Sequence, residues 1–244
     1  MNKKIEIIPA IDLIDGRCVR LSQGDYNQKS VYDDMPVDIA RKFAEIGVKR
    51  VHMVDLDGAK AGAPRNLDTL RQIASLGSLD VEWGGGIKSH KDLQDVIDAG
   101  AGHAIIGSVA VKEPILMDQW LRKHGAKHIV LGADLRHGKV SVSGWLEDSR
   151  LSIHDLMDRF MPCGLREVIV TDISKDGMMS GPTTELYLSL VERYPDVTFT
   201  VSGGISSMAD IEELDRLGLE RVIVGKAIYE GHISLDEIRD FISN

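Results

Sequence analysis

The chain has 244 residues, of which 43% are hydrophobic and 27% charged, a composition typical of a globular protein with a full core. Its formal charge of −9 argues against nucleic acid or an anionic membrane surface as the main partner, but it allows a small phosphorylated substrate bound in a local glycine-rich loop. The length suits an α/β barrel, which typically has about 250 residues in one domain.

The N-terminal residues do not have the pattern of a signal peptide, because Glu6, Pro9 and Asp12 interrupt the apolar run. No apolar span of 18 residues occurs elsewhere. Cys18 and Cys163 stand in no metal-binding or redox spacing. Together these features predict a cytoplasmic protein without a metal site.

Short apolar runs that end in Asp or Gly alternate with helical patterns along the chain. Such runs are typical of strands buried on both faces of a parallel sheet. The expected strands cover residues 5–11, 51–55, the region around 81, 104–106, 128–134, 168–172, 198–202 and 222–224. Among the helix starts, a proline or a capping side chain marks Pro36, Asn66, Ser89, Ser152 and Ser234. Two long polar stretches, 13–35 and 137–150, are expected to be loops with a functional role.

The second half of the chain repeats the pattern of the first. The matching positions lie 117 to 122 residues apart and are Asp12 with Asp134, Val54-Asp55 with Thr171-Asp172, Gly86 with Gly204, and Gly107 with Gly225. Eight strands alternating with eight helices, in two similar halves, predict a single (βα)8 barrel domain over residues 1–244 with a twofold half-barrel repeat. A doubly wound sheet is the alternative, and such sheets rarely carry a second copy of this kind.

Two aspartates stand at equivalent strand ends. Asp12 ends the first expected strand and Asp134 the fifth, so in a barrel both reach one mouth from opposite sides. Two carboxyl groups in one pocket can serve as general acid and general base. The alternative is that each Asp only caps the loop that follows it.

Glycines also follow the third, fourth, seventh and eighth expected strands. Glycine lets backbone N–H groups approach a phosphate closely, and a following helix start favours an anion. The two equivalent sets are Gly85, Gly86, Gly107 and Ser108 in the first half, and Gly203, Gly204, Gly225 and Lys226 in the second. Two sets predict two phosphate sites and a substrate phosphorylated at both ends, with one site and a vestigial copy as the alternative.

Segments spread over nearly the whole chain resemble the HisA family. These are isomerases of histidine biosynthesis that convert the aminoaldose ProFAR (phosphoribosylformimino-5-aminoimidazole carboxamide ribotide) to the aminoketose PRFAR. The matching segments are residues 8–13, 15–17, 19–21, 23–24, 54–56, 84–87, 142–145, 171–177, 202–205 and 224–225. The glycine segments are shared with the sister cyclase family HisF, whereas Arg20 and Ser143-Gly144-Trp145 are typical of the isomerases.

The resemblance implies an Amadori rearrangement that needs no metal or organic cofactor. It implies that Asp12 is the general base and Asp134 the general acid, with Thr171 beside them. Trp145 is expected to fold over the substrate, and Arg20 to contact it from the first loop. A bifunctional isomerase that also acts on phosphoribosylanthranilate remains open, as do, with less support, the sister cyclase and a non-catalytic barrel that binds phosphorylated metabolites. A barrel completed by one chain is compatible with a monomer.

Other polar residues on the same face receive smaller roles. Asp176 and Gly177 are expected to contact the substrate. Three further acids are expected mainly to structure loops: Asp55, Asp57 and Asp172. Three histidines near strands are expected to be structural: His52, His103 and His128. Some positions depart from the family pattern and bear on phosphate affinity rather than on the reaction: Lys88 and Lys226, where Arg is frequent, and Met178, where Thr is usual.

Overall fold

The computed structural model describes residues 4–22, 25–32 and 34–243, and for residues 20–22 and 25–29 it describes the backbone only. Within this part of the chain, eight parallel strands pair side by side in a ring. In ring order they are β1 (Glu6–Ile14), β4 (Arg50–Asp55), β5 (Asp80–Gly84), β6 (His103–Ile106), β7 (Ile129–Arg136), β10 (Glu167–Asp172), β11 (Thr198–Ser202) and β12 (Arg221–Val224). The pairings of β12 with β1 and of β7 with β10 close the ring, which confirms the expected (βα)8 barrel.

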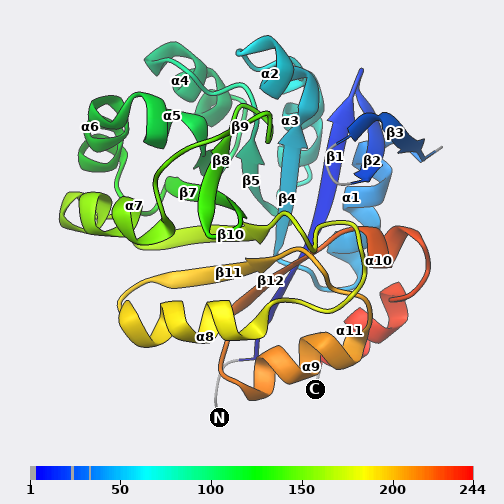
Figure 1. Ribbon diagram of the computed structural model, residues 1–244. Coiled ribbons are helices and arrows are strands. Elements are labelled where there is room, and N and C mark those ends of the chain that lie inside the picture. Colours follow the sequence, from blue (N-terminus) through cyan, green and yellow to red (C-terminus); the bar gives the residue numbers. More distant parts are fainter. Residues whose placement is uncertain (1–3, 23–24, 33, 244) are drawn as a thin grey trace.

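Helices cover the outside of the ring (Figure 1). They are α1 (Pro36–Glu45), α2 (Leu56–Ala61), α3 (Leu67–Ala74), α4 (His90–Asp98), α5 (Ser108–Lys112), α6 (Pro114–His124), α7 (Ile153–Phe160), the 3-10 turn η1 (Met161–Cys163), α8 (Thr184–Arg193), α9 (Met208–Arg216), α10 (Lys226–Tyr229) and α11 (Leu235–Ser243). The expected starts at Pro36, Ser89 and Ser152 are confirmed, the last with a complete capping box. Helix α2 is additional to the predicted elements. None of the helices described has the length and apolarity that a membrane crossing requires.

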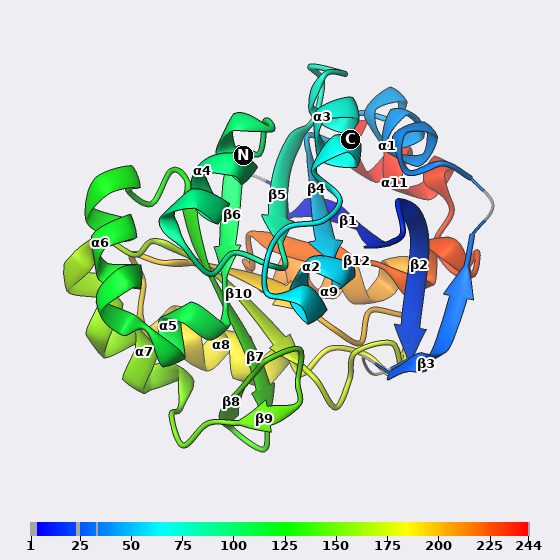
Figure 2. The ribbon, with the colours of Figure 1, turned by 90° about the horizontal axis from the view of Figure 1, so that it is seen from above.

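The prediction that residues 13–35 form a loop is wrong. Strand β1 continues to Ile14 and turns back at Asp15-Gly16 into β2 (Arg17–Ser22), which pairs with β3 (Asp25–Val31). The two turn residues have φ of 51° and 70°. This is the left-handed conformation of a two-residue hairpin turn, which Asp-Gly favours. Figure 2 shows the β2–β3 hairpin standing at the side of the barrel.

The stretch 137–150 also contains strands. Strand β7 turns back at His137-Gly138, with φ of 50° and 74°, into β8 (Lys139–Val142), which pairs with β9 (Glu147–Asp148). Each of the two turns begins three residues after its aspartate, Asp12 or Asp134. The two halves therefore agree at this point, while a repeat of the whole half-barrel stays a prediction.

The barrel interior is layered, because inward-facing side chains alternate with outward-facing ones along each strand. At the amino ends of the strands lies a floor of ion pairs formed by Glu6, Arg50, Glu82, Glu167 and Arg221. Above it packs a small apolar cluster of Ile8, Ala10, Ile105, Val130, Ile169 and Ile223. A much larger apolar core lies between the strands and the helices. The two predicted catalytic aspartates stand above the small cluster, at the mouth.

Candidate active site

A pocket opens at the carboxyl ends of the barrel strands. The predicted site residues that line it are Asp12, Gly85, Gly86, Gly107, Ser108, Asp134, Trp145, Thr171, Asp176, Gly177, Gly203, Gly204, Gly225 and Lys226. Its apolar wall includes Ile105, Ile169 and Ile223 of the inner cluster. Of the predicted site residues, only the side chain of Arg20 lies outside the described part of the chain.

Asp134 lies near the end of β7 and has two polar neighbours. The indole Nε1 of Trp145 donates a hydrogen bond of 2.8 Å to Asp134 Oδ2. Thr171 is the register partner of Asp134 on the neighbouring strand β10. Burial raises the pKa of Asp134 above the ordinary aspartate value, and the Trp145 indole and the Thr171 hydroxyl group lower it without cancelling the shift. This environment favours the protonated form of the carboxyl group.

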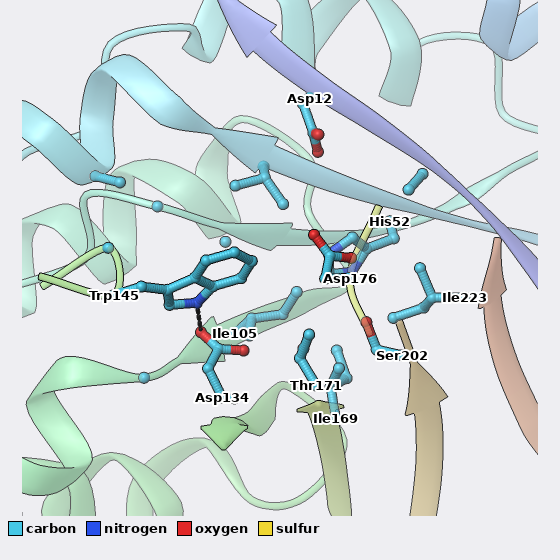
Figure 3. Close-up of a pocket in the computed structure, with 18 of the residues that line it drawn as sticks. Asp12, His52, Ile105, Asp134, Trp145, Ile169, Thr171, Asp176, Ser202 and Ile223 are labelled. Atoms are coloured by element: carbon cyan, nitrogen blue, oxygen red, sulfur yellow. Dashed lines mark hydrogen bonds between the residues drawn. The ribbon is translucent and has the colours of Figure 1, made fainter. Parts of the chain in front are cut away.

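Asp12 faces Asp134 from the other side of the mouth. Its strand β1 lies four places from β7 in the ring of eight, and Figure 3 shows the two carboxyl groups on opposite sides of the pocket. Asp12 pairs in register with Val54 on β4 and with Val19 on β2. It therefore lies inside a three-stranded stretch of sheet that fixes its backbone. A substrate between the two walls can meet one carboxyl group from each side.

The four glycines that follow β5 and β11 adopt a backbone conformation that other residues avoid. Gly85 and Gly86 have φ of 101° and 82°, and Gly203 and Gly204 have 93° and 90°. A methyl group on Gly85 would lie 2.2 Å from the backbone oxygen of Asp55. Close packing against the neighbouring loop therefore already requires glycine here, so these glycines do not by themselves indicate a phosphate.

The segments after β6 and β12 also match each other. Gly107 precedes α5 with φ −101° and ψ −88°, and Gly225 precedes α10 with φ −116° and ψ −96°. Lys226 lines the pocket beside its glycine and donates a hydrogen bond of 3.0 Å to the backbone oxygen of Gly177. Lys88 lines the pocket beside the first glycine set. Each set thus has a lysine in the pocket wall.

Asn66 stands at the start of α3, but the expected side-chain cap is absent. Its amide nitrogen donates to Asp55 Oδ1 at 2.7 Å and to Asp57 Oδ2 at 3.0 Å, while its oxygen accepts from the Gly16 backbone at 2.9 Å. Asp57 also accepts from the Asp15 backbone at 2.7 Å. The capping prediction is wrong because this network uses the side chain to tie the β1–β2 turn to the loop after β4.

Asp55 and Asp172 have the loop-structuring role that the sequence predicts. Asp55 is fully buried and accepts hydrogen bonds from three backbone N–H groups of the segment that follows it. Asp172 accepts from the hydroxyl groups of Ser174 and Thr183, each at 2.6 Å. Both therefore shape the rim of the pocket.

One of the three histidines differs from the expectation. His103 pairs with Asp80 and His128 with a backbone oxygen, as structural residues do. His52, in contrast, lines the pocket together with Asp12 and Asp134. The signal that could have identified it is the alternation along β4, which places His52 on the inward face with Val54 at the strand end.

Comparisons with known proteins agree with this architecture. Residues 6–234 match the family described as "Histidine biosynthesis protein". A relative from Cytophaga hutchinsonii is 47% identical over 97% of this chain and 99% of its own length. Relatives from Bacteroides thetaiotaomicron (47%) and Flavobacterium psychrophilum (45%) match 98% of this chain and 100% of theirs.

All three relatives carry the name 1-(5-phosphoribosyl)-5-((5-phosphoribosylamino)methylideneamino)imidazole-4-carboxamide isomerase, which is ProFAR isomerase. In each case the match extends over nearly the full length of both chains, at 45–47% identity. The chain is therefore an isomerase of histidine biosynthesis and belongs to the ProFAR isomerase (HisA) family.

Proposed function

We propose that this isomerase converts ProFAR to PRFAR by acid–base catalysis between Asp134 and Asp12. The observation that carries the proposal is the pair of carboxyl groups on opposite walls of one pocket, one of which has a raised pKa. Two titratable groups whose environments separate their proton affinities are suited to act as acid and base. We infer the substrate, ProFAR, from the names of the relatives.

Ring opening requires an acid. Protonated Asp134 gives its proton to the ribose ring oxygen as the bond between that oxygen and C1 breaks and the nitrogen lone pair forms a double bond to C1, which leaves an open-chain protonated imine. Oδ2 of Asp134 accepts the Trp145 hydrogen bond, so the other carboxyl oxygen is available to carry the proton. Thr171 steadies the same group from the neighbouring strand.

The rearrangement then requires a base. Ionised Asp12 takes the proton from C2, which gives an enolamine, and returns a proton to C1. The hydroxyl proton lost from the oxygen on C2 goes back to Asp134, now ionised. Both carboxyl groups thereby regain their starting state, and the product is the aminoketose. Steps of this kind contribute about 10²–10⁴-fold to the rate.

The two glycine sets are proposed to hold the two phosphates of the substrate. Lys88 on one side and Lys226 on the other supply positive charge within an acidic protein. A phosphate at each end would fix the reacting carbons between Asp12 and Asp134. We further expect the reaction to proceed in a monomer without metal or organic cofactor.

The proposal is tested by an isomerisation assay with purified protein and ProFAR. Asp12→Asn and Asp134→Asn should each lower kcat by at least ~10²-fold while the circular dichroism spectrum stays unchanged. Asp196→Asn, the same change on the exposed turn before β11, is the control and should leave kcat unaltered. Near-normal turnover in either pocket variant would refute its assigned role.

A parallel assay with phosphoribosylanthranilate as the substrate decides whether the enzyme is bifunctional.

A further inference from the structure

The floor of the barrel is a network of ion pairs well below the reacting groups. Arg221 lies 2.6 Å from Glu167 and 3.2 Å from Glu6, and Arg50 lies 3.2 Å from Glu167. None of these four residues lines the pocket. We interpret them as structural ion pairs that neutralise charges inside the barrel.

Glu82 is the exception, because its two carboxylate oxygens serve different layers. Oε2 lies 3.6 Å from Arg50 in the floor network. Oε1 lies 2.7 Å from Nδ1 of His52, its register partner on the neighbouring strand β4. The Glu82 side chain is only 1% exposed, so solvent screens neither contact at the carboxylate.

His52 carries this connection into the pocket. It lines the pocket with Asp12, Asp134 and Asp176, and it is labelled among these residues in Figure 3. A carboxylate offers only acceptors, so the imidazole must present a proton on Nδ1 to bond with it. In the neutral ring, Nε2 is then the acceptor, and it is the ring nitrogen that remains for the pocket.

We propose that Glu82 is a positioning residue for the isomerisation, which fixes the tautomer and ring orientation of His52 so that Nε2 accepts a hydrogen bond from a hydroxyl group of the opened sugar. This inference rests on the proposed function for its substrate. The logic is that of other carboxylate–histidine pairs, in which the carboxylate orients the ring and sets its tautomer rather than reacting itself.

The test compares Glu82 with Glu167, a matched control that also pairs with Arg50 but does not touch His52. Each is changed to Met and to Gln. The readouts are kcat, KM, the midpoint of urea unfolding, and the ¹⁵N chemical shifts of the His52 ring, assigned with His52→Ala.

Glu82→Met should lower kcat about tenfold or more, with a smaller change in KM, and should shift the His52 nitrogens away from the single Nδ1–H tautomer. Glu82→Gln keeps a carbonyl acceptor and should recover part of the activity. If Glu82→Met does not fold, Glu82→Gln carries the comparison. The Glu167 variants should lose stability without moving kcat or the His52 signals. In a His52→Ala background, the Glu82 change should lower kcat no further.

Equal losses of kcat in Glu82 and Glu167 variants would overturn the proposal and show Glu82 to be structural. An additive loss in the His52→Ala background would overturn it as well. Failure of the wild-type protein to act on ProFAR would refute the proposed function instead, and the His52 nitrogen shifts would still decide whether Glu82 sets the tautomer.

Discussion

In the pocket of this enzyme, the indole nitrogen of Trp145 donates a hydrogen bond of 2.8 Å to the carboxylate oxygen Oδ2 of Asp134. Trp145 belongs to a segment of three consecutive residues with left-handed backbone, Ser143, Gly144 and Trp145, with φ of 58°, 65° and 69°. Such a conformation costs about 1–2 kcal/mol for each residue other than glycine. The segment is held by contacts at both ends, since the Ser143 backbone donates to Ser108 Oγ and Arg136 donates to the Trp145 backbone oxygen. The hydrogen bond thus links the position of Trp145, which is expected to fold over the substrate as a lid, to the carboxyl group of the proposed acid Asp134.

Asp134→Asn should stabilise the protein at neutral pH although it lowers kcat. The pKa of Asp134 is raised by burial, so its contribution to stability is fully present below the pKa of an unfolded aspartate and is lost as the pH rises through the folded value. Asparagine has no such dependence. The gain of the variant over wild type in urea unfolding should therefore be larger at pH 7 than at pH 4. An equal difference at both pH values would contradict the assignment.

Trp145 should leave Asp134 and cover the substrate when the pocket fills. Trp145→Ala should then weaken binding and turnover together, by up to ~10²-fold, without destabilising the barrel. The emission of Trp145 is obtained by subtracting the spectrum of Trp145→Phe, which leaves the buried Trp83 and Trp120. A Trp145 signal that is the same with and without product would make the lid wrong and leave Trp145 a permanent part of the pocket wall.

Asn66→Ser should loosen the β1–β2 turn although serine is a good helix cap. The variant loses donors to Asp55 and Asp57 and the acceptor for Gly16, and an unsatisfied buried group costs about 1–3 kcal/mol. We expect lower stability in urea and faster proteolysis within residues 13–35. Ser89→Ala, which removes only a helix cap, should lower stability without exposing this segment. Equal proteolysis of both variants would argue against the turn contact.

Gly85→Ala should destabilise the protein more than Gly77→Ala. Both residues have positive φ, 101° and 69°, so both substitutions bear the cost of a left-handed backbone, about 1–2 kcal/mol. Only at Gly85 does the new methyl group meet backbone atoms, those of Asp55 at 2.2 Å, whereas nothing lies within 4 Å at Gly77. Overpacking adds about 1–3 kcal/mol. Urea unfolding of the two variants measures the difference, and equal values would contradict the close packing.

Crystals soaked in phosphate should bind one anion near Gly86 and Ser108 and a second near Gly204 and Lys226. The first site has Lys88 in its wall and the second has Lys226. Lys226→Met should remove the second anion and leave the first. Occupancy of a single site in the wild-type protein would favour the alternative of one site and a vestigial copy.

The sequence alone determined the barrel and the placement of its two aspartates. The apolar runs that end in Asp or Gly define strands buried on both faces, and local signals such as Pro36 and Ser152 mark the helix starts, because these features depend on periodicity and backbone chemistry within a few residues. In a closed parallel barrel every strand then ends at the same mouth, so Asp12 and Asp134 reach one pocket.

Only the tertiary structure decided which side chains bond to one another. The Trp145–Asp134 contact depends on how the segment after β8 folds back over β7, and the Glu82–His52 contact depends on the register of β4 against β5. The position of Asn66 in the sequence predicts a helix cap. In the structure its side-chain amide instead bonds to the turn at Gly16, which lies within its reach. Such contacts join residues from different elements, and their geometry is fixed by ring closure and strand register, which no local pattern encodes.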